Sequence, residues 1–217
     1  MGMASLAEHG LPRPPLVVGL TGPIGCGKTA VARWLEARGG WRIDADDAAR
    51  EVTAHGRPEL AAIRGCFGDG VFAEDGSLDR SALAAVVFAD PASLAELEAI
   101  VHPAVAVLVH EGMATAAAAG APFIVIEAIK LVESGLAAAC DEVWLVECAP
   151  AVQRARLVGR GMEPADADRR MAAQGPDLAH RLAPFATRRI VTDGTFADTE
   201  QRVTAALAEA LERRDSR

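Results

Sequence analysis

Eight consecutive residues, Gly22 to Thr29, follow the pattern G-x-x-x-x-G-K-[ST] directly after an apolar run. Glycines at this spacing bring backbone N–H groups close to phosphate oxygens, and the positive end of a following helix strengthens the attraction. Lys28 would neutralise charge on the β- and γ-phosphates, and the Thr29 hydroxyl would be a ligand of Mg²⁺. A Gly-rich turn with a chance lysine is the alternative. The pattern predicts a site for ATP with Mg²⁺ made by Gly22, Gly25, Cys26, Gly27, Lys28, Thr29 and Ala30.

A second group of reactive side chains follows the next apolar segment, in Ile43-Asp44-Ala-Asp46-Asp47. Asp46 or Asp47 could cap the helix that follows, a role in which aspartate is favoured. Alternatively, Asp46 faces the γ-phosphate and orients or deprotonates an acceptor hydroxyl. The residues alone do not decide between these two hypotheses.

Two other classes of phosphate-loop protein fit the sequence poorly. The guanine site of a GTPase requires an Asn-Lys-x-Asp motif, and this chain contains no asparagine. A motor ATPase usually has an apolar strand that ends in Asp-Glu, whereas the strand predicted at 123–127 ends in the single Glu127. These absences favour a small-molecule kinase.

The four cysteines show no CxxC spacing, so the sequence indicates neither a zinc site nor a disulfide framework. Cys26 lies among the N–H donors of the loop and near Lys28, a setting that lowers the pKa of a thiol. We therefore expect a thiol reagent to react with Cys26 and to inactivate the protein, and MgATP to protect it. If nucleotide gives no protection, the reactive thiol would be Cys66, Cys140 or Cys148.

The elements that must position these residues alternate between strand and helix, which predicts an α/β doubly wound sheet. Apolar runs predict buried strands, and apolar residues at helical spacing predict the helices between them. The predicted strands are 16–21, 41–44, 123–127, 142–147 and a short 189–192. The predicted helical segments are 28–38, most of 47–118, the solvated 154–174 and a closing amphipathic helix at 198–213.

The charge balance restricts the partners. The chain has 22 Lys and Arg residues against 30 Asp and Glu, a net charge of −8, which argues against nucleic acid or an anionic membrane as partner. The uncharged run 112–126 contains Gly120 and Pro122 and is too short to span a bilayer. The polar, proline-containing residues 1–15 predict a disordered leader. We expect a cytoplasmic protein that is a monomer or small homo-oligomer and binds a small molecule.

Several segments together resemble the dephospho-CoA kinase family. Besides the phosphate loop they are Val18-Gly-Leu-Thr-Gly22, Ile43-Asp-Ala-Asp46, Asp75-Gly-Ser-Leu-Asp-Arg80-Ser-Ala-Leu83, Val87-Phe-Ala-Asp90-Pro91 and Leu97-Glu-Ala-Ile-Val-His102-Pro103. The resemblance implies phosphoryl transfer from ATP to the ribose 3′-hydroxyl of dephospho-CoA. It implies a P-loop kinase fold with a five-stranded parallel sheet (16–46, 119–153 and 181–213), a helical substrate domain (47–118) and a lid (154–180).

The same resemblance implies roles for individual residues. Asp46 would be the general base or orienting carboxylate, Arg50, Arg80 and His102 would line the substrate site, and Arg156 and Arg160 would lie in the lid. Each has a simpler alternative. The arginines could form carboxylate pairs or a solvated helix face, and His102 could be a hydrogen-bonded turn histidine beside Pro103.

The chain departs from the family pattern at two places that matter for recognition. Ile129 and Lys130 replace the usual Pro and Leu, and Thr192-Asp193-Gly194 lacks the usual Asn, which leaves the adenine contact open. Lys130 would pair with Glu127 or Glu133, bind a substrate phosphate, or lie at the surface without a role. The alternative functions are a kinase for another nucleotide or sugar, and a weakly active nucleotide-binding regulator.

Overall fold

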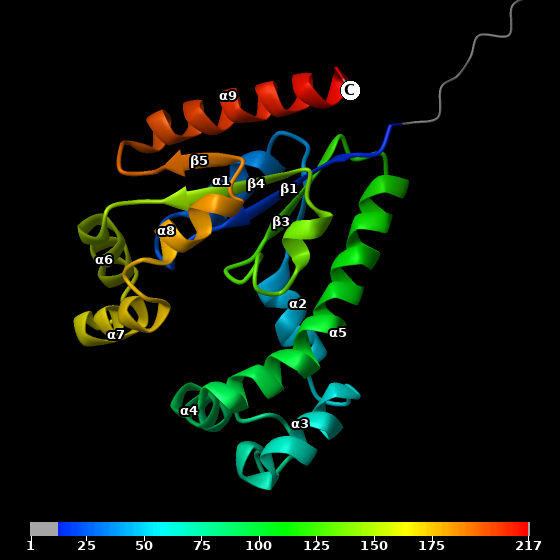
Figure 1. The fold of residues 1–217 in the computed structure, drawn as a ribbon, viewed down its shortest axis with the longest axis vertical. Coiled ribbons are helices and arrows are strands. Elements are labelled where there is room, and N and C mark those ends of the chain that lie inside the picture. Colours follow the sequence, from blue (N-terminus) through cyan, green and yellow to red (C-terminus); the bar gives the residue numbers. More distant parts are fainter. Residues whose placement is uncertain (1–12, 217) are drawn as a thin grey trace, which may run out of the picture.

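A computed structural model describes residues 13–216 of the chain. Its centre is one sheet of five parallel strands in the order β2-β3-β1-β4-β5. The strands are β1 (Leu16–Thr21), β2 (Trp41–Asp44), β3 (Phe123–Glu127), β4 (Glu142–Glu147) and β5 (Arg188–Val191). Figure 1 labels β1, β3, β4 and β5. The predicted strands are confirmed; the last one lies one residue earlier than expected.

Side chains alternate between the two faces of the sheet, and helices cover both faces. On one face Val18, Leu20 and Trp144 pack with α1 (Lys28–Glu36) and α9 (Phe196–Asp215). On the other face Ile124 and Ile126 pack with α2 (Ala45–Val52) and α5 (Pro91–Ala118). The central strands β1, β3 and β4 are therefore buried along their whole length and are mostly apolar, as expected inside a parallel sheet. The edge strands β2 and β5 are less buried and carry charged residues.

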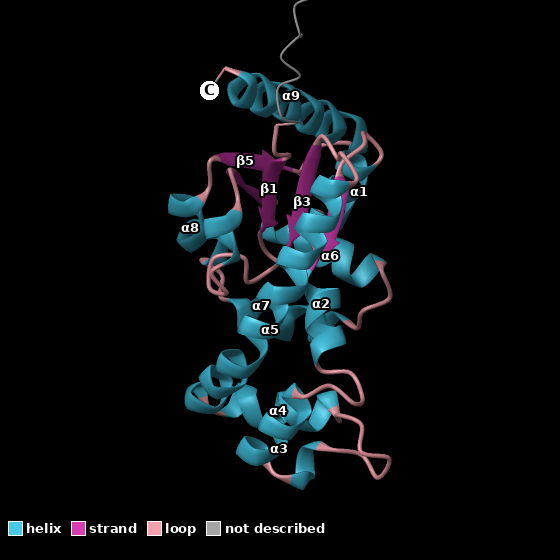
Figure 2. Cartoon of the chain, turned by 90° about the vertical axis from the view of Figure 1, so that its right-hand side faces the viewer, coloured by secondary structure: helices cyan, strands magenta, loops and turns pink. Residues whose placement is uncertain are grey.

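The segment between β2 and β3 extends away from the sheet as a helical insertion (Figure 2). It contains α2, α3 (Glu59–Phe67), the 3₁₀ turn Asp69–Val71, α4 (Arg80–Ala89) and α5. Its outer part has a small apolar core of its own, centred on Leu60, Ile63, Val71, Leu83 and Val87. This core does not include residues of the sheet.

Helix α5 connects the insertion to the sheet and contains Pro103 in its interior. Figure 1 shows the helix bending part-way along its length. In the described part of the chain α5 is the one helix long and apolar enough to cross a membrane by length and composition. In this fold it packs against α2, α3, α4, β2 and β3.

The predicted single helical segment at 154–174 is wrong in detail. Two helices occupy it, α6 (Pro150–Gly159) and α7 (Pro164–Gln174), each of which has a proline in its first turn. A short α8 (Leu178–Leu182) leads back to β5. Helix α9 begins with a capping box between Thr195 and Asp198, two residues earlier than predicted. The predicted leader falls mainly on residues 1–12, outside the described residues.

Candidate active site

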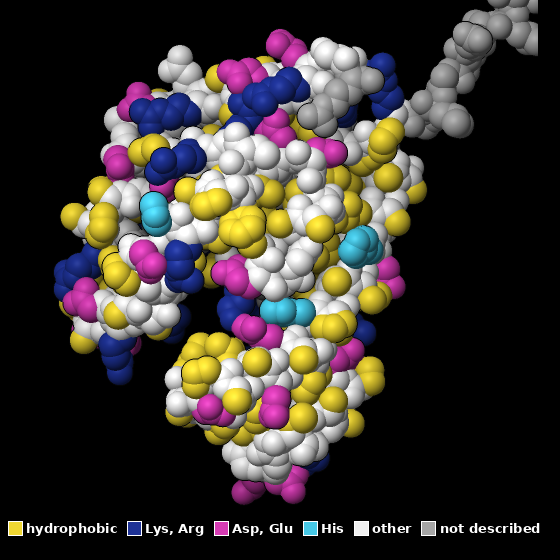
Figure 3. Space-filling view, in the orientation of Figure 1, with side chains coloured by type: hydrophobic (Ala, Val, Ile, Leu, Met, Phe, Trp, Pro, Cys, Tyr) yellow, Lys and Arg dark blue, Asp and Glu magenta, His cyan; other side chains and the backbone are white. Residues whose placement is uncertain are grey.

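All five strands point the same way, so their carboxyl ends form one edge of the sheet. At this edge β1 ends at Thr21 and continues into the phosphate loop, and β2 and β3 end in the carboxylates Asp44 and Glu127. Strand β4 ends at Glu147 and is followed by Cys148, and β5 ends at Val191 and is followed by Thr192. Ligands of open α/β sheets bind at this edge. Figure 3 shows the surface hollowed between the part formed by α6 and α7 and the part formed by α3 and α4.

The phosphate loop lies tightly on strand β4. A Cβ atom on Gly22 would approach the Val146 carbonyl oxygen to 2.0 Å, and the Gly22 φ of 139° is rarely adopted by other residues. Gly25, with φ 77°, faces the side chain of Leu157. Both positions therefore require glycine, which explains the spacing that the sequence displays.

Lys28 lies at the first position of α1 and is buried. Its Nζ donates to the carbonyl oxygens of Gly22 at 2.7 Å and Pro23 at 3.0 Å, within the loop itself. Burial lowers the pKa of Lys28, and the nearby carboxylate of Glu127 opposes the shift. When ATP binds, phosphate oxygens would replace these two backbone carbonyls as the hydrogen-bond partners of the ammonium.

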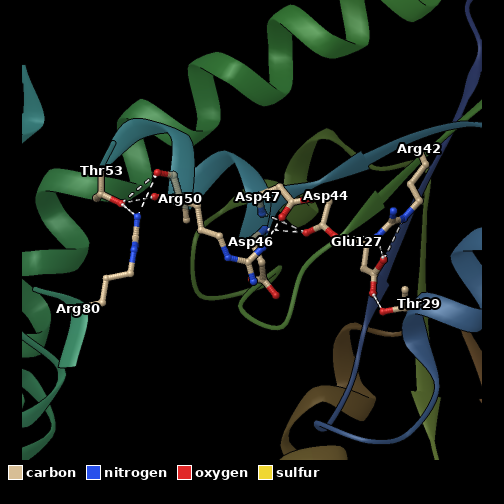
Figure 4. A network of polar contacts seen from close by, with 10 residues as sticks. Thr29, Arg42, Asp44, Asp46, Asp47, Arg50, Thr53, Arg80 and Glu127 are labelled. Carbon is tan, nitrogen blue, oxygen red and sulfur yellow. Dashed lines mark hydrogen bonds and ion pairs between the residues drawn. The ribbon is translucent and has the colours of Figure 1, made fainter. Parts of the chain in front are cut away.

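A chain of polar contacts connects the loop to the ends of β3 and β2 (Figure 4). The Thr29 hydroxyl donates to Glu127 at 2.6 Å, and Arg42 donates to Glu127 at 2.7 Å and to Asp44 at 2.6 Å. Glu127 is 5% exposed, and its charge is compensated by the guanidinium of Arg42. Sequence reasoning missed Arg42, and it did not predict the contacts of Glu127 with Thr29 and Arg42.

The helix cap at the end of β2 is Asp44. Its side chain accepts from the backbone N–H groups of Asp46 at 3.0 Å and Asp47 at 3.2 Å. The hypothesis that Asp46 or Asp47 caps this helix is therefore wrong, because α2 begins earlier, at Ala45. Asp47 pairs with Arg50. Asp46 has no capping role and keeps its carboxylate free for a ligand.

The environment of Asp46 raises its pKa. Desolvation by surrounding atoms is the main cause, the negative charge of Asp44 adds to it, and the positive charge of Lys28 opposes it. The residue is nevertheless accessible at the surface. A raised pKa on an accessible carboxylate is the property expected of a group that accepts a proton from a substrate.

Three residues predicted to bind substrate line one cavity of about 320 Å³ between α2, α4 and α5: Arg80, His102 and Lys130. Apolar side chains, Leu83, Val87 and Phe88 among them, form much of its wall. Arg80 donates to the Thr53 hydroxyl at 2.9 Å and to the Arg50 carbonyl at 3.2 Å. Arg50 itself does not line this cavity and points to Asp47 (Figure 4).

Two expectations about this cavity need correction. His102 lies inside α5, so the hypothesis of a turn histidine is wrong. Lys130 pairs with Glu98 of α5, and neither Glu127 nor Glu133 is its partner. The pair joins the loop after β3 to the insertion, residues that are 32 apart in the chain.

A second cavity, of about 430 Å³, lies between α1, α6 and the start of α9. Arg156 and Arg160 both line it, together with Trp34, Thr195 and Phe196. Arg156 donates to the Thr192 hydroxyl at 2.8 Å and to the Thr192 carbonyl at 2.5 Å. Arg160 ends α6 as its C-cap residue. The cavity opens beside Gly27 and Ala30 of the phosphate loop.

Two glutamines attach the helices after β4 to the phosphate loop. Gln153 of α6 donates to the Ile24 carbonyl at 2.8 Å, and Gln174 of α7 accepts from the Ile24 N–H at 2.9 Å. Both backbone groups of Ile24 are thus satisfied by side chains from distant segments. The contact of Gln174 with the loop was not predicted from the sequence.

The expected lowering of the Cys26 pKa is wrong. The side chain is fully buried, and its Sγ lies 2.8 Å from the Sγ of Cys148. The hydrogen bond with Cys148 and burial raise the pKa of Cys26, an effect larger than that of Lys28. The pKa of Cys148 is lowered instead, mainly by the same hydrogen bond and also by the positive charge of Arg156. Protection of a thiol by MgATP stays a prediction.

The relationships of the chain follow from comparison with known proteins. A family model described as dephospho-CoA kinase matches residues 16–198. The chain belongs to the dephospho-CoA kinase family. The family resemblance inferred from the residues is thereby confirmed, as are the assignment to the kinases and the P-loop kinase fold.

Relatives and solved structures agree with this family. A dephospho-CoA kinase of Streptomyces avermitilis is 48% identical over 202 residues, which cover 91% of this chain and 95% of that protein. The dephospho-CoA kinase of Geobacter metallireducens is 40% identical over 199 residues, with 91% and 98% covered. A Thermus thermophilus protein of known structure superimposes with a TM-score of 0.76 at 31% identity, over 91% of this chain and 98% of the other.

Proposed function

We propose that this member of the family transfers the γ-phosphoryl group of ATP to the ribose 3′-hydroxyl of dephospho-CoA, giving coenzyme A and ADP. The observation that carries the proposal is the division of labour between two carboxylates. Asp44 caps helix α2, so Asp46 is free at the strand edge with a raised pKa. A kinase that phosphorylates an alcohol needs such a carboxylate to orient the attacking hydroxyl and accept its proton.

On this proposal Asp46 takes the proton of the 3′-hydroxyl. At the same time the hydroxyl oxygen forms a bond to the γ-phosphorus, and the bond between the γ-phosphorus and the ADP oxygen breaks. Lys28 leaves the carbonyl oxygens of Gly22 and Pro23 and donates to phosphate oxygens, where negative charge develops. The buried position of Lys28 strengthens this attraction, because little water screens it.

The donor set at Thr29 suits Mg²⁺, which prefers oxygen ligands and takes one or two protein oxygens together with substrate phosphates. The Thr29 hydroxyl and the Glu127 carboxylate lie 2.6 Å apart and supply only oxygen atoms. Among residues 13–216 no group of three or more His, Cys, Asp or Glu side chains could hold a metal alone, so the phosphates would supply the other ligands. When bound, the ion would neutralise charge on the β- and γ-phosphates.

We assign the two cavities to the two substrates. Arg156 and Arg160 would bind ATP phosphates, with Arg160 acting on the transferred group, and the cavity beside Trp34 and Phe196 would receive the adenine. Arg80, His102 and Lys130, with Arg50 nearby, would bind dephospho-CoA, whose apolar arm would lie on Val87 and Phe88. The domain limits follow the same assignment: residues 47–118 hold the substrate and residues 154–180 close over ATP.

Cytoplasmic location and a monomeric or small homo-oligomeric state belong to the proposal as expectations of the sequence. The acidic net charge of −8 supports a small-molecule substrate over a nucleic-acid or membrane partner.

The deciding experiment measures ADP release with dephospho-CoA, adenosine, AMP and pantetheine as parallel acceptors. We expect release with dephospho-CoA far above that with the other three. Preferential turnover of adenosine or AMP would indicate a kinase for another nucleotide, and nucleotide binding without turnover of any acceptor would indicate a regulator.

A further inference from the structure

Two cysteines that are 122 residues apart in the chain meet behind the phosphate loop. Cys26 is the fifth residue of the loop, and Cys148 directly follows β4, the strand on which the loop lies. Their sulfur atoms are 2.8 Å apart and share a hydrogen bond. Neither thiol has a part in the phosphoryl transfer proposed above. The cysteines are not in a CxxC motif, so the sequence does not indicate that they form a pair.

The backbone holds both residues in place. The strand residue before Cys148 accepts at its carbonyl from Thr192 N–H at 2.9 Å, and the residue after it donates its N–H to Asp193 at 2.7 Å. The Cys26 carbonyl accepts from the Thr192 hydroxyl at 2.8 Å. Thr192 therefore binds the chain next to both cysteines, and the contact between the sulfurs follows from this shared anchor.

The two thiols differ in a way that suits a two-step oxidation. Cys148 is partly exposed and stands near the guanidinium of Arg156, which favours its thiolate. Cys26 is fully buried, and the hydrogen bond with Cys148 and burial raise its pKa. An oxidant can reach Cys148, whereas Cys26 can react only with what forms on Cys148. Accessible thiolates beside a second, resolving cysteine are the usual sites of reversible oxidation.

We propose that Cys148 and Cys26 form a peroxide-reactive dithiol site that closes reversibly to a disulfide between β4 and the phosphate loop. The Cys148 thiolate attacks hydrogen peroxide, which forms an S–O bond and breaks the O–O bond. Cys148 becomes a sulfenic acid, and hydroxide is released. The Cys26 sulfur then attacks the Cys148 sulfur, forms the S–S bond and expels the oxygen, which leaves as water with the Cys26 proton. A dithiol reductant reverses the reaction by exchange.

The remaining cysteines provide internal controls. Cys66 is exposed on α3 in the insertion, and Cys140 donates to the Leu136 carbonyl and has a pKa raised to about 12 by burial. Cys66 is more accessible than Cys148, but it lies in the insertion, away from Cys26 and Arg156, the groups that activate Cys148. General surface oxidation would therefore modify Cys66 at least as fast as Cys148.

The test treats the reduced full-length chain with hydrogen peroxide and maps disulfides by mass spectrometry without reduction. We expect one cross-linked peptide pair containing Cys26 and Cys148, with the mass of two hydrogen atoms lost and restored by dithiothreitol. Oxidation of Cys66 without this cross-link, or a disulfide between two chains, would overturn the proposal. This measurement needs no variant, so it does not depend on the folding of one.

Variants then separate the two steps. Cys148→Ser should slow peroxide consumption at least about tenfold, since the accessible thiolate is lost. Cys26→Ser should leave a sulfenic acid on Cys148 that a dimedone probe labels, and Cys66→Ser should behave as the parent. Unchanged peroxide consumption in Cys148→Ser would contradict the assignment of the attacking thiol, and absence of dimedone labelling in Cys26→Ser would contradict the resolving role.

Discussion

The carboxyl edge of the sheet and the cavity of the helical insertion are built in opposite ways. At the sheet edge the functional side chains already bind one another: Thr29 binds Glu127, Glu127 binds Arg42, and Lys28 binds its own loop. In the insertion the cavity wall is mainly apolar, and its exposed Phe88 lies at the surface. The comparison teaches that the groups proposed for chemistry are held in position by polar contacts, whereas the groups proposed for recognition lie on a surface that the substrate has to complete.

Substitution of the two lysines of the chain tests this comparison most directly, because Lys28 lies at the sheet edge and Lys130 lines the cavity of the insertion. Lys28→Ala should reduce kcat/KM by at least about 100-fold, since the ammonium acts on charge that develops in the transition state. Lys130→Ala is the matched control and should change it far less. Steady-state ADP release, with circular dichroism to verify folding, measures both. Near-parental turnover of Lys28→Ala would remove the kinase assignment.

The neighbouring aspartates test the site of proton transfer. Asp46→Asn should lower kcat by about 100-fold or more with little change in the KM for ATP, because the amide cannot accept the proton. Asp47→Asn is the control, since Asp47 pairs only with Arg50 in this structure. Both variants should keep the melting temperature of the parent, as Asp44 provides the helix cap. Equal losses in the two variants would assign the effect to local charge alone.

Lys130 tests recognition on the insertion side. Lys130→Leu, which restores the residue usual in the family, should raise the KM for dephospho-CoA a few-fold and leave the KM for ATP unchanged. The loss should shrink as ionic strength rises, because salt already screens a half-exposed contact.

Glu98→Gln separates substrate binding by Lys130 from the ion pair seen here. Removing the carboxylate frees the lysine, so the KM for dephospho-CoA should fall or stay unchanged. If Glu98→Gln raises this KM as much as Lys130→Leu does, the pair between the loop and α5 is what matters, and Lys130 does not bind substrate.

The smallest effect concerns pH. The negative charge of Asp44 helps to raise the pKa of Asp46, so activity should be lost as pH falls through this raised value. In Asp44→Asn the charge is removed, the pKa of Asp46 falls, and the acid limb of kcat/KM should move to lower pH. Asparagine caps a helix about as well as aspartate, so stability should change little. An unchanged acid limb would show that another group controls it.

The sequence predicted the features that depend on neighbouring residues. The phosphate loop and the strands were found because their patterns are local, and the insertion because its segments resemble one family. The contacts that hold the site join distant residues: Thr29 with Glu127 is 98 residues apart, Ile24 with Gln174 is 150 apart, and Cys26 with Cys148 is 122 apart. No local pattern contains such pairs.

Two errors have the same physical origin. The choice of cap among Asp44, Asp46 and Asp47 depends on where α2 begins, and a shift of two residues exchanges the capping carboxylate of Asp44 for that of Asp46. A lowered pKa of Cys26 was inferred from its helix terminus and Lys28, but the hydrogen bond with Cys148 and the burial of Cys26 outweigh both. In each case the surroundings in three dimensions decided the property.

Helix α5 connects the outer core of the insertion mechanically to the sheet. Its first part packs through Leu94, Leu97 and Ile100 into the outer core, and its later part packs through Val105 and Val109 onto the sheet. At 28 residues it is about 40 Å long, so a small angular change becomes a large displacement at its far end.

A displacement of the outer core relative to the sheet would therefore bend α5, because the helix packs into both. Pro103 lies between the two packed parts and lacks the N–H that would bind the Ala99 carbonyl, so bending costs least there. The hinge falls one residue from His102, in the wall of the substrate cavity. A bend of α5 at Pro103 would therefore also change the shape of that cavity.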